Sequence, residues 1–119
     1  MTNQKLSRVL ISGLALMALL SAVAFAKGSR TINLRVAASL DGTQVEAGQY
    51  ELSWEEHSPQ ATVTLSRGKN TVVTAQGRLE ERKVKYDSNT MVLDTASNGS
   101  QIIREFRPAG TNKAIVFVE

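Results

Sequence analysis

A period-two alternation of apolar and polar residues constrains this chain more than any other feature of its sequence. After Gly48, the residues Tyr50, Leu52 and Trp54 fall on one face of an extended segment, and the polar residues between them fall on the other. Tyr and Trp side chains each bury roughly 150 to 250 Å² when they are enclosed. We therefore expect the stretch 45–54 to supply the centre of a hydrophobic core.

The same alternation recurs along most of the chain. It is clearest in residues 31–40, where every second residue from Ile32 to Leu40, Val36 included, is apolar, so we expect one continuous strand there. In residues 79–86 a half-exposed strand is favoured over a short helix covering 79–83. Further strands are expected at 43–45, 61–66, 71–76, 90–96, 100–107 and 114–118.

Short turns separate these segments. Asp41-Gly42 and Asn98-Gly99 are hairpin dipeptides, and the second predicts a type I′ turn, which needs positive φ at both central residues. Pro59 ends the central strand, and Gly77 predicts a bulge or bend. About eight short strands with no room for crossover helices predict an all-β domain, either a single antiparallel β-sandwich or a partly closed barrel, with mostly consecutive pairing.

The N-terminus has the pattern of an export signal. Lys5 and Arg8 precede the apolar run 9–20, and the triplet Ala24-Phe25-Ala26 is typical of a cleavage site. The prediction is a signal-peptide helix at 1–26, which directs the protein to the periplasm or out of the cell. An uncleaved, membrane-anchoring helix is the alternative, because residues 9–26 approach the length of a membrane span.

Cleavage after Ala26 would leave one all-β domain, residues 27–119. It removes two of the 14 basic residues and none of the 11 acidic ones, so the net charge falls from +3 to +1. A field this weak argues against a nucleic-acid partner. With no cysteine, disulfides and thiolate metal sites are excluded, and the domain must be stabilised by its core.

Residue patterns that support catalysis are missing. His57 is the sole histidine, and with Glu55 and Glu56 it offers one imidazole without helical spacing, a weak basis for a metal site. No serine lies in a G-x-S-x-G setting. We expect no enzyme activity, no cofactor and no metal.

Six residues are the candidate contacts for a partner, either a protein or a glycan of the cell envelope. They comprise one aromatic residue of the central strand, the sole histidine and four basic residues in or beside a predicted strand. They are Trp54, His57, Arg78, Arg82, Lys83 and Lys85. Two alternatives stay open: Trp54 is a core residue, and the basic residues, interleaved with Glu80 and Glu81, form an ordinary solvated surface.

The segment Ala47-Gly48-x-Tyr50-x-Leu52-x-Trp54, following an export signal, resembles a group of small exported, uncharacterised β-proteins of soil bacteria. That resemblance implies the fold but no activity. The turn is also similar to one in transthyretin-like, carboxypeptidase-regulatory sandwich modules, from which this chain departs by having Glu46 where proline is usual.

Taken together, the residues predict an exported, non-catalytic β-domain that acts by binding or assembly through sheet edges or loop tips. The alternative is a small barrel that encloses a hydrophobic ligand. Its cavity would be lined by Tyr50, Trp54, Tyr86 and Phe106.

Overall fold

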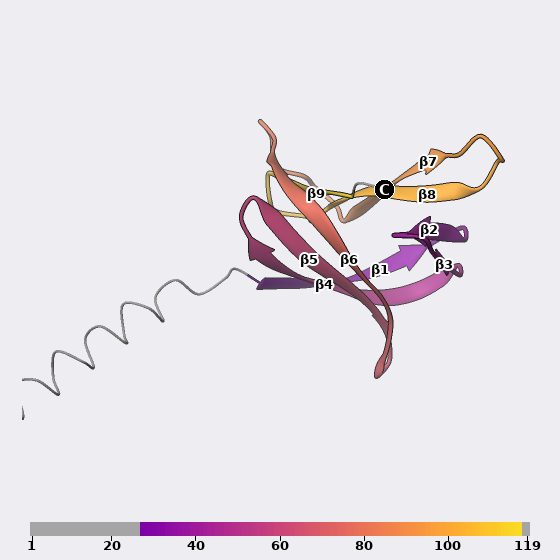
Figure 1. Ribbon diagram of the computed structural model, residues 1–119. Helices are drawn as coiled ribbons and strands as arrows, with labels where there is room; N and C mark the ends of the chain where they lie inside the picture. The colour runs from indigo at the N-terminus through magenta and orange to yellow at the C-terminus, as the bar shows by residue number, and fades with distance from the viewer. Residues whose placement is uncertain (1–26, 118–119) are drawn as a thin grey trace, which may run out of the picture.

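The computed structural model describes residues 27–117, which are coloured by position in Figure 1. The expected signal peptide and its cleavage site, residues 1–26, lie outside the described part of the chain, as do residues 118–119. Within residues 27–117, no helix is long and apolar enough to cross a membrane.

Nine strands account for most of the described chain, and residues 27–117 contain no helix. The strands are β1 (Lys27–Leu34), β2 (Ala38–Leu40), β3 (Thr43–Val45), β4 (Gly48–His57), β5 (Gln60–Arg67), β6 (Asn70–Glu81), β7 (Thr90–Thr95), β8 (Gln101–Arg107) and β9 (Lys113–Phe117). The all-β prediction is confirmed.

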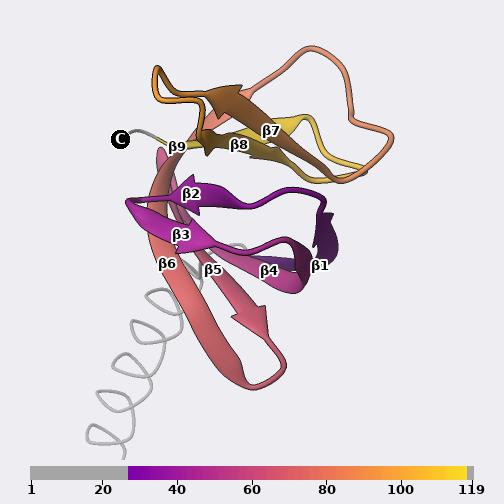
Figure 2. The same cartoon turned by 90° about the vertical axis from the view of Figure 1, so that its right-hand side faces the viewer.

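The strands form a single sheet that folds over on itself into two facing layers (Figure 1). The strand order is β1-β4-β5-β6-β9-β8-β2-β3, and β7 pairs with β8. One layer contains β1, β4 and β5, the other contains β7, β8 and β9, and β6 belongs to both. The β2–β3 hairpin lies between the layers at one end (Figure 2). The sheet stays open and does not close into a barrel.

Strand β4 confirms the prediction that one of its faces supplies the core. Tyr50, Leu52 and Trp54 are all buried, and Trp54 packs edge to face on Phe106 of β8, with ring centroids 5.9 Å apart. Because β4 and β8 belong to opposite layers, this contact lies where the two layers meet. Leu52 and Phe106 are both 0% exposed, as expected for the centre of the core.

Gly77 marks the point at which β6 changes partners. It pairs with Ala61 of β5 and also with Phe117 of β9. A Cβ atom at this position would lie 2.6 Å from Cγ2 of Ile115 and 3.1 Å from the carbonyl oxygen of Val116. The glycine therefore allows the neighbouring strand β9 to lie close against β6. The irregularity in the β5–β6 register falls elsewhere, between Leu65 and Ser66.

The two hairpin dipeptides adopt different turns. Asp41 and Gly42 both have positive φ, 51° and 76°, so the β2–β3 hairpin has the type I′ geometry. At Asn98-Gly99 the type I′ prediction is wrong, because within this pair only Gly99 has positive φ, 88°. The N–H of Gly99 donates to the carbonyl oxygen of Ala96, and the N–H of Ala96 donates to that of Ser100. This is a three-residue loop in which a glycine follows a tight turn.

The strand expected at 31–40 is broken. β1 ends at Leu34 and β2 begins at Ala38, and between them Val36 is 47% exposed instead of facing the core. The break lets the two halves join different parts of the sheet, since β1 pairs with β4 and β2 pairs with β3 and, in parallel, with β8. Most strand pairs are nevertheless consecutive in the chain, as expected.

The strand expected at 79–86 is correct only as far as Glu81. Residues 82–89 are irregular, and no helix forms there. The segment is held instead by the turn between β8 and β9. The N–H groups of Arg82 and Tyr86 donate to the carbonyl oxygens of Asn112 and Thr111, at 2.6 and 2.9 Å. Hydrogen bonding to a turn replaces pairing with a strand.

Candidate functional site

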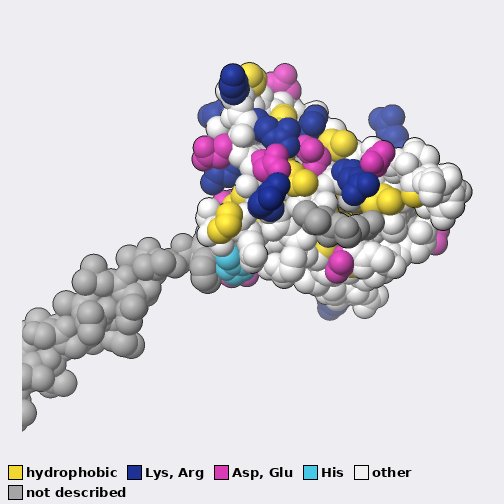
Figure 3. Space-filling model, turned by 45° about the horizontal axis from the view of Figure 1, so that its top comes forward, with side chains coloured by type: hydrophobic (Ala, Val, Ile, Leu, Met, Phe, Trp, Pro, Cys, Tyr) yellow, Lys and Arg dark blue, Asp and Glu magenta, His cyan; other side chains and the backbone are white. Residues whose placement is uncertain are grey.

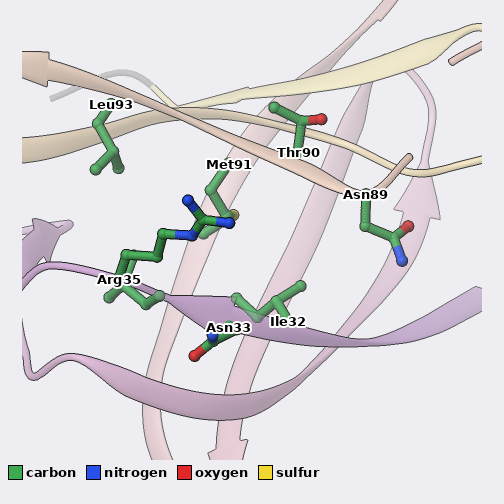
Figure 4. Close-up of a pocket in the computed structure, with 8 residues that line it drawn as sticks. Ile32, Asn33, Arg35, Asn89, Thr90, Met91 and Leu93 are labelled. Atoms are coloured by element: carbon green, nitrogen blue, oxygen red, sulfur yellow. The ribbon is translucent and has the colours of Figure 1, made fainter. Parts of the chain in front are cut away.

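A groove separates β1 from β7 on the open side of the fold (Figure 4). Its volume is about 480 Å³, within the range of roughly 300 to 1,000 Å³ found for ligand sites. We call it the β1–β7 groove. It is lined by Ile32, Asn33, Leu34, Arg35, Asn89, Thr90, Met91 and Leu93.

Both sides of the β1–β7 groove are strand edges. β1 is one of the terminal strands of the sheet and pairs only with β4, while β7 pairs only with β8. Within residues 27–117, neither strand has a partner strand on its other side. Backbone N–H and C=O groups along such edges are a template for pairing with another chain.

The inner wall of the β1–β7 groove is apolar. It consists of core-facing side chains that no further strand covers. Met91 and Leu93 register opposite Phe106 and Ile103 of β8, whose side chains are fully buried. The two β7 residues point to the same interior yet stay half-buried, packing on the edge of the core. Ile32 on the β1 side is buried and completes this wall. An occupant would cover apolar surface that the domain itself leaves partly exposed.

The polar groups of the β1–β7 groove are mostly neutral. Asn33, Asn89 and Thr90 supply amide and hydroxyl groups. The Asn89 carbonyl oxygen accepts a hydrogen bond from the backbone N–H of Ala109 at 2.8 Å, which leaves the Asn89 amide N–H groups to donate elsewhere.

Arg35 is the one charged side chain that lines the β1–β7 groove. It follows the end of β1, in the break before β2, and Figure 4 shows its guanidinium reaching toward β7. Among residues 27–117, no hydrogen bond, ion pair or ring contact engages this guanidinium. Each of the other described arginines has at least one. They are Arg30, Arg67, Arg78, Arg82, Arg104 and Arg107.

Trp54, one of the six predicted contact residues, is in the core. It is 7% exposed, and a Cβ on Gly28 would overlap its ring, so β1 lies directly against the indole. The Arg30 guanidinium lies 5.3 Å from the ring centroid, and the indole N–H donates to a carboxylate oxygen of Glu56 at 3.2 Å. The same Glu56 carboxylate pairs with Lys113 of β9 at 3.2 Å. Packing and hydrogen bonding therefore explain the position of Trp54 as a core residue.

His57 is the last residue of β4 and is half-buried. It registers opposite Gln60 across a two-residue turn whose Ser58–Pro59 peptide bond is cis. In the part of the chain that the structure describes, no three potential ligands gather closely enough to hold a metal ion.

Arg78 and Arg82 belong to a chain of ion pairs on the outer face of β6 and β8. Arg78 and Arg82 both contact Glu80, at 3.0 and 3.1 Å, and Arg82 also contacts Glu105 at 3.5 Å. Glu105 in turn pairs with Arg107 at 2.8 Å. Figure 3 shows basic and acidic side chains intermixed on this face.

The ion-pair chain perturbs two ionisation equilibria. The hydrogen bond from Arg78 is the largest influence that holds the pKa of Glu80 below its ordinary value of 4.5. The hydrogen bond to Glu105 raises the pKa of Arg107. Both shifts favour the charged forms. The arginines of this chain are paired with Glu80 or Glu105, so they are less available to bind an anion.

Lys83 and Lys85 are exposed in the irregular segment 82–89, apart from the ion-pair chain. Val84 between them is 74% exposed. The structure thus brings Arg78 and Arg82 together through Glu80, and places Lys83 and Lys85 on a neighbouring loop.

The four aromatic residues expected to line a cavity are not arranged around one. Tyr50, Trp54 and Phe106 are buried in the core. Tyr86 lies in segment 82–89, under the Arg107 guanidinium at 5.4 Å, and its buried hydroxyl has no hydrogen-bond partner among the described residues. None of the four lines the β1–β7 groove.

The β1–β7 groove was missed at the level of sequence. Its residues come from two segments more than fifty positions apart, and nothing in either segment indicates that the two edges face each other. Arg35 gives no local signal either, because it falls on the polar side of the alternation in residues 31–40, where a charged residue is ordinary.

No family model, no curated protein and no solved structure matches this chain. The resemblances to exported β-proteins of soil bacteria and to transthyretin-like modules therefore stay predictions.

Proposed function

We propose that this protein is an exported, non-enzymatic binding or assembly domain of the cell envelope, and that it binds an extended peptide segment of a partner protein by strand addition. The observation that carries the proposal is the pair of unpaired strand edges, β1 and β7, that face each other across a groove of about 480 Å³. A peptide laid in this groove would hydrogen-bond to an edge through its backbone and bury alternate side chains against Met91 and Leu93.

Export is supported by the sequence of residues 1–26 and is tested separately from binding. Intact-mass measurement of protein recovered from the envelope and the medium should give a chain that begins at Lys27. A full-length chain retained in the membrane would support the anchored alternative.

Strand addition is tested with a capped hexapeptide of alternating valine and threonine. Amide resonances of β1 and β7 in a ¹⁵N-labelled sample should shift on titration, because new backbone hydrogen bonds form along these edges. A twin peptide with alternate backbone nitrogens methylated keeps the side chains and loses the donors, so it should leave the spectrum unchanged. Equal shifts with both peptides, or shifts elsewhere in the sheet only, would refute strand addition.

A further inference from the structure

We propose that the β1–β7 groove selects an extended peptide that carries an acidic residue, and that Arg35 is the residue that selects it. This inference rests on the proposed function and adds the chemistry of the partner. It comes from the one arginine in residues 27–117 that has no interaction within that part of the chain.

The isolation of Arg35 is the first step of the argument. Two carboxylates on neighbouring strands are already engaged. Asp94 near the end of β7 pairs with Arg104 at 3.1 Å, and Glu51 of β4 accepts hydrogen bonds from Ser29 and Thr31. None of the residues that line the groove is acidic, so Arg35 has no competing carboxylate there. Its five N–H donors are available in a planar fork that fits a carboxylate with two parallel hydrogen bonds.

The surroundings of Arg35 strengthen such a pair. The apolar wall formed by Met91, Leu93 and Ile32 excludes part of the water from one side of the groove. A charge pair formed against this wall is less screened than one on an open surface. Because no lining residue is acidic, a basic peptide would meet only repulsion at this position.

The open edges favour a peptide over a fatty acid, which could also offer a carboxylate and an apolar chain. A hydrocarbon tail in the β1–β7 groove would cover backbone N–H and C=O groups of β1 and β7 without bonding to them, and burying polar groups unpaired is unfavourable. An extended peptide satisfies the same groups. Its side chains alternate in direction, so one set faces the apolar wall while a neighbouring acidic side chain reaches Arg35.

The test uses protein purified after expression of the full chain and three capped hexapeptides of alternating valine and threonine. One central position carries glutamate, glutamine or lysine. Dissociation constants come from ¹⁵N amide titrations that follow β1 and β7. We expect the glutamate peptide to bind about tenfold more tightly than the glutamine peptide, and the lysine peptide to bind most weakly.

Substitutions then assign the preference to one side chain. Arg35→Gln should equalise the glutamate and glutamine peptides without abolishing their binding, and Arg35→Lys should keep part of the preference. Lys69→Gln is the matched control, because it removes the same charge from the exposed β5–β6 turn, and it should leave the preference intact.

The outcomes separate the two proposals. Equal binding of the glutamate and glutamine peptides at β1 and β7 refutes acidic selection and leaves strand addition standing. Absence of any peptide-induced shift at these strands refutes strand addition itself. Tighter binding of dodecanoate than of the glutamate peptide, with loss on Arg35→Gln, would show that the occupant is a lipid carboxylate and overturn the peptide assignment. Concentration-dependent dimerisation that blocks the peptide would assign the groove to a second copy of the chain.

Discussion

The two sides on which the layers of this domain approach each other are built in opposite ways. On one side β6 passes continuously from the first layer to the second, and Gly77 lets Ile115 of β9 come within 2.6 Å of the position a Cβ would take. On the other side β1 and β7 face each other without pairing, across the β1–β7 groove. Residue size and charge account for the difference. A missing side chain closes the first side, whereas half-buried apolar side chains and an unpaired arginine line the second.

The comparison implies that stability resides on the closed side and in the core, while the open side is available for binding. Four comparisons between variants test this division, and their expected effects decrease from the first to the last.

Phe106→Ala should have the largest effect. Phe106 is fully buried against Trp54, and truncation of such a residue costs about 3–5 kcal/mol, through lost burial and the cavity that remains. The free energy of unfolding from urea titration measures this. Met91→Ala is the matched control, because Met91 pairs with Phe106 in the β7–β8 register but borders the groove. It should cost less than half as much, and equal costs would contradict the division.

Gly77→Ala should destabilise the closed side by about 1–3 kcal/mol, the usual range for overpacking. The added methyl group would meet Ile115, which is 1% exposed and has no room to move away. Urea denaturation again gives the value. Gln76→Ala, one residue earlier on the exposed face of β6, is the control and should change stability by less than about 0.5 kcal/mol. A neutral Gly77→Ala variant would show that β9 is not closely packed against β6 there.

A third comparison sets an arginine with internal contacts, Arg67, against the arginine of the groove, Arg35. Arg67→Gln should cost about 1 kcal/mol, since it removes a hydrogen bond of 3.0 Å to the Tyr50 hydroxyl and a cation–π contact at 4.5 Å. Arg35→Gln should change stability by less than about 0.5 kcal/mol, because no interaction within residues 27–117 is lost. Thermal unfolding of both variants under one buffer condition is the measurement. A larger loss for Arg35→Gln would reveal a structural role for this residue.

The smallest effect is the pH dependence contributed by Glu80. Its pKa in the folded state lies below the ordinary value of 4.5, so its stabilising contribution is present above pH 4.5 and is lost as the pH falls through the lower, folded-state pKa. The difference in Tm between the wild type and Glu80→Gln should therefore shrink as the pH is lowered from 7 to 3. Exposure and salt screening keep this difference small. A difference that grows toward low pH would contradict the assignment.

The sequence was sufficient to predict the core and the fold class. Alternation in β4 placed Tyr50, Leu52 and Trp54 in the interior, since burial of one strand face depends only on residues two positions apart. The strand expected at 114–118 was also correct, since β9 spans Lys113–Phe117 and lies between β6 and β8. Periodicity along one strand is local information, and it was reliable.

Pairing between strands that are far apart in the sequence was harder to predict. The alternation in residues 31–40 continues through Val36, but the strand is interrupted there. The interruption allows β1 and β2 to join different parts of the sheet, and this long-range requirement leaves no trace in the local pattern. The groove depends on the same requirement, since it exists only where β1 and β7 come to face each other. At Asn98-Gly99 the dipeptide located the hairpin but not its turn type, because loop length also enters.

The place of β9 in the sheet has a consequence for how the chain is made. Strand β9, the last strand of the described chain, fills the gap between β6 and β8 and so joins the first layer to the second. A chain still under synthesis lacks this bridge, and its early hairpins have no opposite layer to pack on. Cooperative folding of the two-layer domain therefore has to wait until β9 has been synthesised, because β6 and β8 are not joined before then.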